Sequence, residues 1–313
     1  MVIYLRAIFL LISNKAVSIC CLLLLCTIIS VQSQEVIYSP AYFGPNANPV
    51  AEFTDATIPK TTQLDLSYNS FFGFGDKTTN LHFRVEVPLF SRRVSLKVWT
   101  AILENYEVTP TVYNKRNMQE DMLAGRADGD IYVQTRIRIL SERKYLPSII
   151  VNSTLKTASG THFKNRRFFD TPGYYFDAEL GKSICTKSKV VSEIRFVANA
   201  GFLCWETTGS RQNDATMYGG KLILSNHLFD LENSLSGYRG RLKNGDAPVV
   251  YNAKFVYKQP TCHFYVRYQY GIKDYPYHHI QAGVVLLLAK LTPYNRKGGK
   301  LRMESDVKLK AEN

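Results

Sequence analysis

The sequence predicts an all-β protein that forms a single antiparallel transmembrane β-barrel of about twelve strands. Apolar and polar residues alternate in short runs from residue 61 to residue 291, as in strands with one apolar and one polar face. The connections between these runs alternate between short and long, and aromatic residues on the apolar face are concentrated near the ends of the runs. No amphipathic helix of convincing length interrupts the series, which argues against a fold built from βαβ units.

Residues 1–33 are predicted to be an export signal peptide. They contain Arg6 and Lys15, no acidic residue, and an apolar run over residues 16–29. This run is shorter than the roughly 20 apolar residues that a membrane-spanning helix needs, which favours a cleaved signal over a permanent anchor. The cysteines after it, Cys185, Cys204 and Cys262, are odd in number and lack metal-like or redox-like spacing, so no disulfide framework is predicted.

Two segments without strand periodicity flank the predicted barrel. Residues 34–60 are dotted with Pro, Asn and Ala, which predicts an extended lead-in segment, and residues 292–313 form a basic tail. Because an even number of strands returns the chain to its starting side, both segments are predicted to lie in the periplasm. They could bind a periplasmic protein partner there, although flexible termini are the commoner alternative.

The expected strands follow one another closely. In the second, the apolar residues of 81–89 alternate with His82, Arg84 and Glu86, and a turn at 91–93 joins it to the third. The eighth is weakened by Gly219 and Gly220, and the twelfth is apolar on both faces but too short for a membrane helix. The expected strands cover residues 64–74, 81–89, 94–102, 131–139, 149–156, 174–180, 193–202, 217–226, 229–235, 251–257, 262–270 and 280–291.

Connection lengths favour a membrane barrel over a soluble β-sandwich, because outer-membrane barrels alternate short periplasmic turns with longer outer loops. The short set lies at residues 91–93, 141–147, 182–190, 226–228 and 258–260, and the long set includes 104–130, 157–172 and 206–216. The 20 Tyr and 17 Phe fit the aromatic girdles of such a barrel, whereas a sandwich has no reason to girdle its apolar face. We therefore expect the long connections to face outward.

The polar parity of the strands predicts a charged lumen. A one-residue slip would turn its basic residues toward lipid, at a cost of about 2–4 kcal/mol each at the midplane, which fixes the register. This lining is either a selectivity filter for small, anionic solutes or a set of salt bridges that fills the lumen. The predicted lumen-facing residues are Arg84, Glu86, Lys97, Arg136, Arg138, Asp177, Glu179, Glu193, Arg195, Lys254 and Arg267.

With this alternation, residues 61–291 resemble a Gram-negative outer-membrane β-barrel, and the Tyr- and Asn-rich style resembles barrels of the Bacteroidota. The lead-in Tyr42-Phe43-Gly44-Pro45-Asn46-Ala47-Asn48-Pro49 is similar to segments of uncharacterised exported proteins of that group. The resemblance implies the architecture and a bacterial outer-membrane location, and it carries over no functional residue. One departure is the end Ala311-Glu312-Asn313, because such barrels usually end on an aromatic residue; Tyr294 is the candidate for that role.

No catalytic motif supports an enzyme. Ser67 and His263 are not paired by spacing, and the adjacent His278 and His279 would lie on opposite faces of a strand, which argues against a shared metal. We therefore predict no catalytic, cofactor-binding or metal-binding residue. The predicted function is a narrow channel for small polar or anionic solutes. The alternatives are an accessory barrel of an envelope secretion or assembly complex and, third, an outer-membrane lipid hydrolase.

Net charge indicates the class of partner. The chain carries a formal charge of +13, which falls to +11 without the two basic residues of the signal. A basic excess usually indicates a polyanionic partner. Because nucleic acid is not expected outside the cytoplasm, the predicted partners are outer-membrane lipid and the phosphates of lipopolysaccharide.

Overall fold

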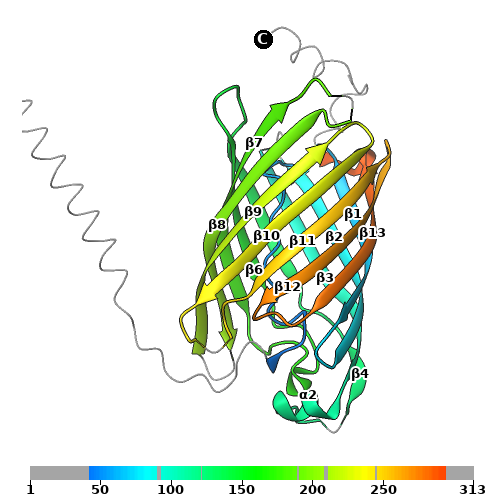
Figure 1. The fold of residues 1–313 in the computed structure, drawn as a ribbon, viewed down its shortest axis with the longest axis vertical. Coiled ribbons are helices and arrows are strands. Elements are labelled where there is room, and N and C mark those ends of the chain that lie inside the picture. Colours follow the sequence, from blue (N-terminus) through cyan, green and yellow to red (C-terminus); the bar gives the residue numbers. More distant parts are fainter. Residues whose placement is uncertain are drawn as a thin grey trace, which may run out of the picture. The chain divides into compact units, whose positions relative to one another are not determined.

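In the computed structural model, which describes residues 42–89, 93–120, 122–188, 190–207, 211–243 and 245–293, twelve antiparallel strands close into a barrel (Figure 1). Each strand pairs with its neighbour along the chain, and β1 pairs with β13 to close the ring. The strands are β1 (Thr62–Phe72), β2 (Asp76–Leu89), β3 (Val94–Val108), β5 (Tyr132–Leu140), β6 (Ser148–Lys156), β7 (Gly173–Cys185), β8 (Glu193–Thr207), β9 (Arg211–Ser225), β10 (Phe229–Gly240), β11 (Val249–Lys258), β12 (Cys262–Lys273) and β13 (His278–Leu288). The predicted fold class is confirmed.

The two faces of the barrel wall have opposite character. Tyr68 on β1 is 57% exposed, whereas its neighbours Ser67 and Asn69 are buried inside. The same alternation leaves apolar side chains such as Leu155 and Phe255 exposed on the outside. A soluble sheet would bury this apolar parity, so the outer face is suited to hydrocarbon. Among the described residues, no helix is long and apolar enough to cross a membrane.

The two ends of the barrel differ. The short-turn end carries the connections between β2 and β3, β5 and β6, β7 and β8, β9 and β10, and β11 and β12, and the 3-10 helix η3 (Ala289–Leu291) follows β13. At the long-loop end, residues 109–131 carry α2 (Pro110–Lys115) and β4 (Ala124–Ala127), which pairs only with β3 (Figure 1). Residues 157–172, with the 3-10 helix η2 (Phe163–Asn165), also lie at this end.

Several predicted boundaries are corrected by local geometry. Residues 206–216 do not form a long loop, because β8 and β9 extend into this region, and Gly219 and Gly220 do not interrupt β9. A bulge in β3 places Ile102 opposite no residue of β2, since Leu81 pairs with Leu103 and His82 with Ala101. The bulge shifts the parity of β3, so that it continues to Val108 with Glu104 inside.

The ends of the first and last strands also differ from the prediction. β1 stops at Phe72, because Gly73 and Gly75 adopt positive φ angles in the turn that follows. β13 stops at Leu288, and the predicted continuation to Leu291 is a 3-10 turn. The predicted signal peptide and nearly all of the predicted tail, Tyr294 included, lie outside the described residues.

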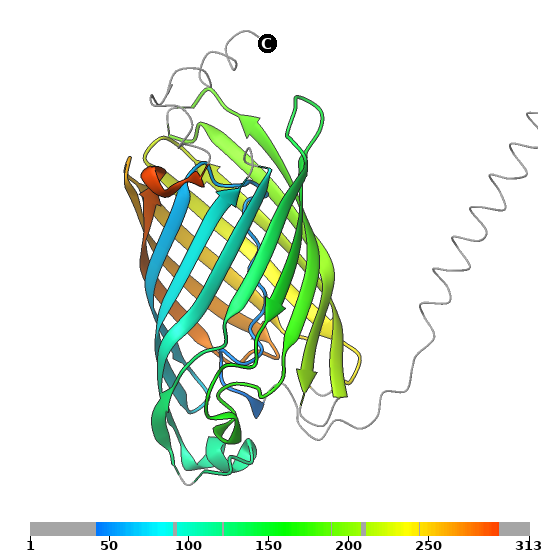
Figure 2. The same ribbon diagram turned by 180° about the vertical axis from the view of Figure 1, so that it is seen from behind.

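The largest correction concerns the lead-in, which was predicted to lie in the periplasm. Residues 42–59, which we name the lumen segment, run through the inside of the barrel (Figure 2). The segment starts at the long-loop end, where Gly44 N donates to Arg166 O at 2.7 Å, and ends at the short-turn end, where β1 begins. It shows no strand periodicity because, in the described part of the chain, it joins no strand and meets the wall mainly through wall side chains.

Candidate functional site: the occupied lumen

Glu179 of β7 is the main anchor of the lumen segment. Its carboxylate accepts hydrogen bonds from Thr54 N at 2.9 Å, from Ala56 N at 3.0 Å and from Thr54 Oγ1 at 2.6 Å. Arg136 of β5 donates to the same threonine hydroxyl and also pairs with Glu86 of β2 at 2.7 Å. Because a buried backbone N–H needs a partner, a wall carboxylate takes the place of the missing β-ladder here.

Two cations of the wall bind the carbonyl groups of the same stretch. Arg195 Nε on β8 donates to Asp55 O at 2.6 Å, and Lys221 Nζ on β9 donates to Phe53 O at 2.7 Å. The Phe53 ring lies against Gly219, where an added Cβ would come within 2.5 Å of its Cε1 atom. A glycine is therefore required at this wall position as long as the segment stays in place.

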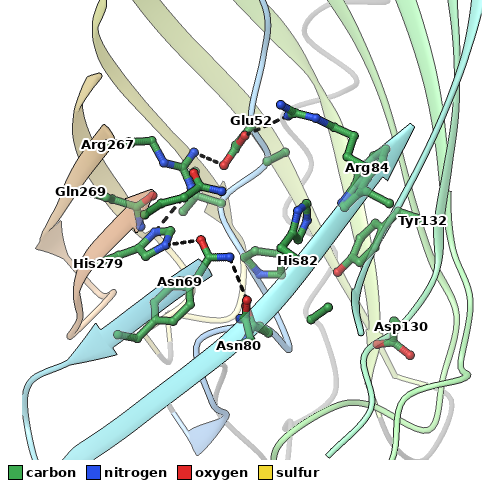
Figure 3. A pocket seen from close by; sticks show the side chains of 18 of the residues that line it. Glu52, Asn69, Asn80, His82, Arg84, Asp130, Tyr132, Arg267, Gln269 and His279 are labelled. Carbon is green, nitrogen blue, oxygen red and sulfur yellow. Dashed lines mark hydrogen bonds and ion pairs between the residues drawn. The ribbon is translucent and has the colours of Figure 1, made fainter. Parts of the chain in front are cut away.

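Glu52 lies at the centre of the lumen, between two arginines (Figure 3). Its carboxylate accepts a hydrogen bond from Arg267 of β12, and its Oε2 atom lies 3.9 Å from Arg84 Nη1 of β2. Arg84 also pairs with Asp65 of β1, and Arg267 Nη2 lies 3.4 Å from His279 Nδ1. One acidic side chain of the segment thus bridges two cations of the wall.

Two cavities flank this bridge. The central cavity, of about 130 Å³, lies toward the long-loop end, and aromatic side chains including Trp99, Tyr132 and Trp205 line it. The short-turn cavity, of about 310 Å³, lies toward the other end and is strongly polar. Glu52, Arg84 and Arg267 line both cavities, so the bridge lies where the two cavities adjoin.

The wall of the short-turn cavity has a basic surplus. The lumen segment adds two carboxylates, Glu52 and Asp55, to this cavity, so it offsets most of the surplus. The wall itself contributes six basic residues, Arg84, Lys97, Arg136, Lys221, Lys254 and Arg267, and three acidic ones, Glu86, Asp230 and Glu232.

A second ionic cluster closes the long-loop end. Arg167, which is fully buried in the loop of residues 157–172, pairs with Glu104 at 2.7 Å and with Asp76 at 3.1 Å. Burial lowers the pKa of Arg167, but these two carboxylates outweigh burial and hold the pKa above its ordinary value. Gly44 lies so close to the guanidinium that a Cβ would come within 2.6 Å of its Cζ atom. The start of the lumen segment is thereby fixed between loop and wall.

The short-turn end carries a smaller ionic contact. Glu142, in the connection of residues 141–147, accepts from Ser183 N at 2.7 Å and from Arg195 Nη1 at 2.6 Å. Burial raises the pKa of Glu142, but these hydrogen bonds and the charge of Arg195 outweigh it and hold the pKa below its ordinary value. Arg195 therefore connects this turn with the lumen segment.

Most of the predicted lumen residues lie around the segment or its cavities. Asp177 accepts from Asn152 at 2.8 Å and from Asn199 at 2.6 Å, beside Glu179. Glu193 lines a further cavity at the short-turn end, and Arg138, half-buried, shares the parity of Arg136. The residues that line the two main cavities or contact the segment are Arg84, Glu86, Lys97, Arg136, Glu179, Arg195, Lys254 and Arg267.

Four further important residues were not among the predicted lumen residues. Lys221 follows the two glycines that weakened the eighth predicted strand, and Glu104 follows the bulge. Arg167 lies in a loop, where period-2 alternation carries no information. Nothing in the sequence distinguishes Glu52 from any other acidic residue of an aperiodic segment.

The side chains weighed for catalysis or metal binding have other contacts. Ser67 Oγ accepts from Gln281 Nε2 at 2.8 Å. His279 points inward to Asn69 at 2.8 Å, while His278 contacts Tyr268 on the outer face, as the alternation predicts. Within the described part of the chain, no group of three or more His, Cys, Asp or Glu residues could hold a metal ion.

No protein-family model matches the chain, and no curated protein matches it. Among solved structures, it is similar to the COG4313 outer membrane channel from Pseudomonas putida F1, with 10% identity and a TM-score of 0.51 over 76% of this chain and 100% of that one. The NanC porin gives 10% identity and a TM-score of 0.49 over 72% and 100%. The transport unit of the autotransporter AIDA-I from Escherichia coli gives 8% identity and a TM-score of 0.46 over 78% and 94%.

At these identities the likeness concerns the fold alone. The closed ring of twelve antiparallel strands and the apolar outer face are independent observations that agree with it. Together they identify the chain as a β-barrel of the bacterial outer membrane.

Proposed function

We propose that the protein is a channel for small anionic solutes, closed in this structure by the lumen segment. The observation that carries this proposal is the basic surplus of the short-turn cavity, where six basic and three acidic wall residues meet two carboxylates of the segment. When the segment leaves, its two negative charges leave with it. Asp65 and Glu179, which pair with Arg84 and Arg136, reduce the remaining surplus to one positive charge, and this surplus favours anions in the lumen, because basic side chains attract them and repel cations.

The way in which the segment is held supports its role as a gate. Its central stretch is bound by separate side chains, Glu179, Arg195 and Lys221, and not by a continuous ladder. The two cavities beside it mean that it does not pack against the whole circumference of the wall. Such contacts can be broken one by one, whereas a strand of the barrel cannot leave without opening the ring.

The orientation of the channel is part of the proposal. Outer-membrane barrels place their longer loops outside, so the long-loop end faces the cell exterior and the short-turn cavity faces the periplasm. The Pseudomonas putida protein with a similar fold is described as an outer membrane channel, in line with this proposal. Lipid and lipopolysaccharide surround the outer face in this arrangement.

Conductance in a planar bilayer tests the proposal. The intact protein should open rarely, and a variant that lacks residues 42–56 should conduct steadily. In a KCl gradient, the sign of its reversal potential should show that chloride passes more readily than potassium. Phe53→Ala, which keeps the chain length, provides a second test if the deletion impairs assembly. A deletion variant that still shows the heat-dependent gel mobility of a folded barrel but is silent, or prefers cations, would refute the channel.

A second function is favoured by the buried ion pairs at the long-loop end. Arg167 with Glu104 and Asp76 closes this mouth firmly, which suits a barrel that never conducts and serves as an accessory component of an envelope complex. Such a protein should stay silent in all variants and copurify with partners in fixed stoichiometry. The periplasmic protein partner predicted from the sequence would be one component of such a complex.

A further inference from the structure

We propose that Arg84 and Arg267 form a binding site for the carboxylate of a small solute, and that Glu52 occupies this site as a tethered substitute. The inference rests on the proposed channel, because it names the class of solute that the lumen recognises. The bound carboxylate is present in the structure itself: Glu52 accepts from Arg267 and faces Arg84 (Figure 3). Any free carboxylate of similar size can make the same contacts.

The site offers more polar groups than Glu52 uses. Arg267 is 9% exposed, and its Nε atom has no hydrogen-bond partner among the described residues. Within the described part of the chain, His82 Nδ1 and Tyr132 Oη are also buried without a hydrogen-bond partner, and both residues line the same central cavity as Arg267. Buried polar groups without partners are costly, which indicates room for a ligand that satisfies them.

The central cavity provides space for the rest of the solute. One water molecule takes up about 30 Å³ in the liquid, so about 130 Å³ holds roughly four water-sized groups. The rings of Trp99 and Tyr132 stack with their centroids 5.0 Å apart, and the Trp205 ring lies perpendicular to that of Tyr132, with 6.4 Å between the centroids. These aromatic side chains give a cavity of mixed lining an apolar side next to the arginines, and apolar surface beside convergent polar groups is typical of a site for a small organic molecule. The site therefore fits an organic acid with a short apolar body.

Glu52 competes with such a ligand because it belongs to the same chain. A tethered group acts at an effective concentration in the millimolar range or above, so it masks a site of modest affinity. Glu52→Gln removes the competing charge and leaves the arginines in place. The glutamine side chain has nearly the same size and shape as that of glutamate, so the packing of the lumen segment changes little.

The two tryptophans of the chain allow a direct measurement. Trp99 and Trp205 are its only tryptophans, and both line the central cavity. Intrinsic fluorescence of the full chain in detergent therefore reports binding of sodium propionate, which matches the glutamate side chain, and propionamide is the uncharged control. We expect Glu52→Gln to bind propionate at least about tenfold more tightly than the unchanged protein, and Arg267→Gln and Arg84→Gln in that background to abolish the gain.

Matched controls are Glu107→Gln and Arg239→Gln, which change exposed residues outside the lumen site and should leave propionate binding unchanged. Equal affinity of Glu52→Gln and the unchanged protein would overturn the inference, as would equal binding of propionate and propionamide. Binding in detergent does not require conduction. Propionate binding with a silent bilayer would thus refute the channel alone, and conduction without binding would refute the carboxylate site alone.

Discussion

Two adjacent glycines of β9 provide a test of the gate that changes no charge. Gly219 points into the lumen, where a Cβ would lie 2.5 Å from Phe53 Cε1, whereas a Cβ on Gly220 would meet nothing within 4 Å. Gly219→Val should push the segment away from the wall, and Gly220→Val is the matched control on the outer face. Valine suits a strand at both positions, so the change in strand propensity cancels in the comparison.

The expected size follows from the packing of Phe53. Its ring is 6% exposed and belongs to a cluster with Val197 and Ile223, so it has little room to yield. Overpacking of such a site costs about 1–3 kcal/mol. If this strain is relieved when the segment leaves, the ratio of open to closed channels should rise about 5- to 150-fold.

Single-channel recording gives the open probability of both variants under the same voltage and salt. Heat-dependent gel mobility first verifies that each variant has assembled. Gly219→Val should open far more often than Gly220→Val, with unchanged anion preference. Equal open probabilities of the two assembled variants would refute the idea that Phe53 holds a movable gate against the wall.

Three further predictions follow from individual contacts. Glu179→Gln removes the charged acceptor of the Thr54 and Ala56 amides, so these two amides should exchange hydrogen at least about tenfold faster, as measured by mass spectrometry. Arg167→Met removes the cation that pairs with buried Glu104 and one of the two cations that pair with Asp76, which keeps Arg116, so it should lower the free energy of unfolding in lipid vesicles by about 3–5 kcal/mol; an unchanged urea midpoint would contradict this. The pKa of Glu142 is lower in the folded protein than its ordinary value of 4.5, so the ionised side chain stabilises the turn at neutral pH and this stabilisation is lost as the pH falls below 4.5. Protection of residues 141–147 from hydrogen exchange should therefore decrease on acidification. Glu142→Gln should abolish this pH dependence.

Alternation predicted the wall because the lipid outside and the polar lumen inside impose opposite requirements on neighbouring residues. Arg136 and Glu179 could thus be assigned to the inner parity from sequence. The assignment failed where the backbone departs from a regular strand: the bulge at Ile102 shifted the parity and hid Glu104. At Gly219 a side chain is absent because Phe53 of the lumen segment packs there, and the residues next to Gly219 in the sequence do not indicate this contact.

The role of the lead-in could not be derived in this way. A charged inner face is compatible with water, with mutual salt bridges or with a bound segment, since each satisfies the same buried groups. The interpretation of the lining as a set of salt bridges is partly realised, as in the pair of Arg136 with Glu86. Arg195 and Lys221, however, also donate to backbone carbonyls of the segment, and the sequence does not show which carbonyl groups will accept such hydrogen bonds.

The path of the lumen segment reverses one conclusion drawn from the even strand number. That number places Thr62 and Leu288 at the same end of the barrel, but Phe43 lies at the other end, packed on Phe169 at 4.0 Å. Because Lys221 and Arg267 belong to β9 and β12, their contacts with the segment form only when strands late in the chain have joined the wall. The segment therefore cannot make all of its contacts before β12 has joined the wall, and the charges that hold it are those that would face water once it left.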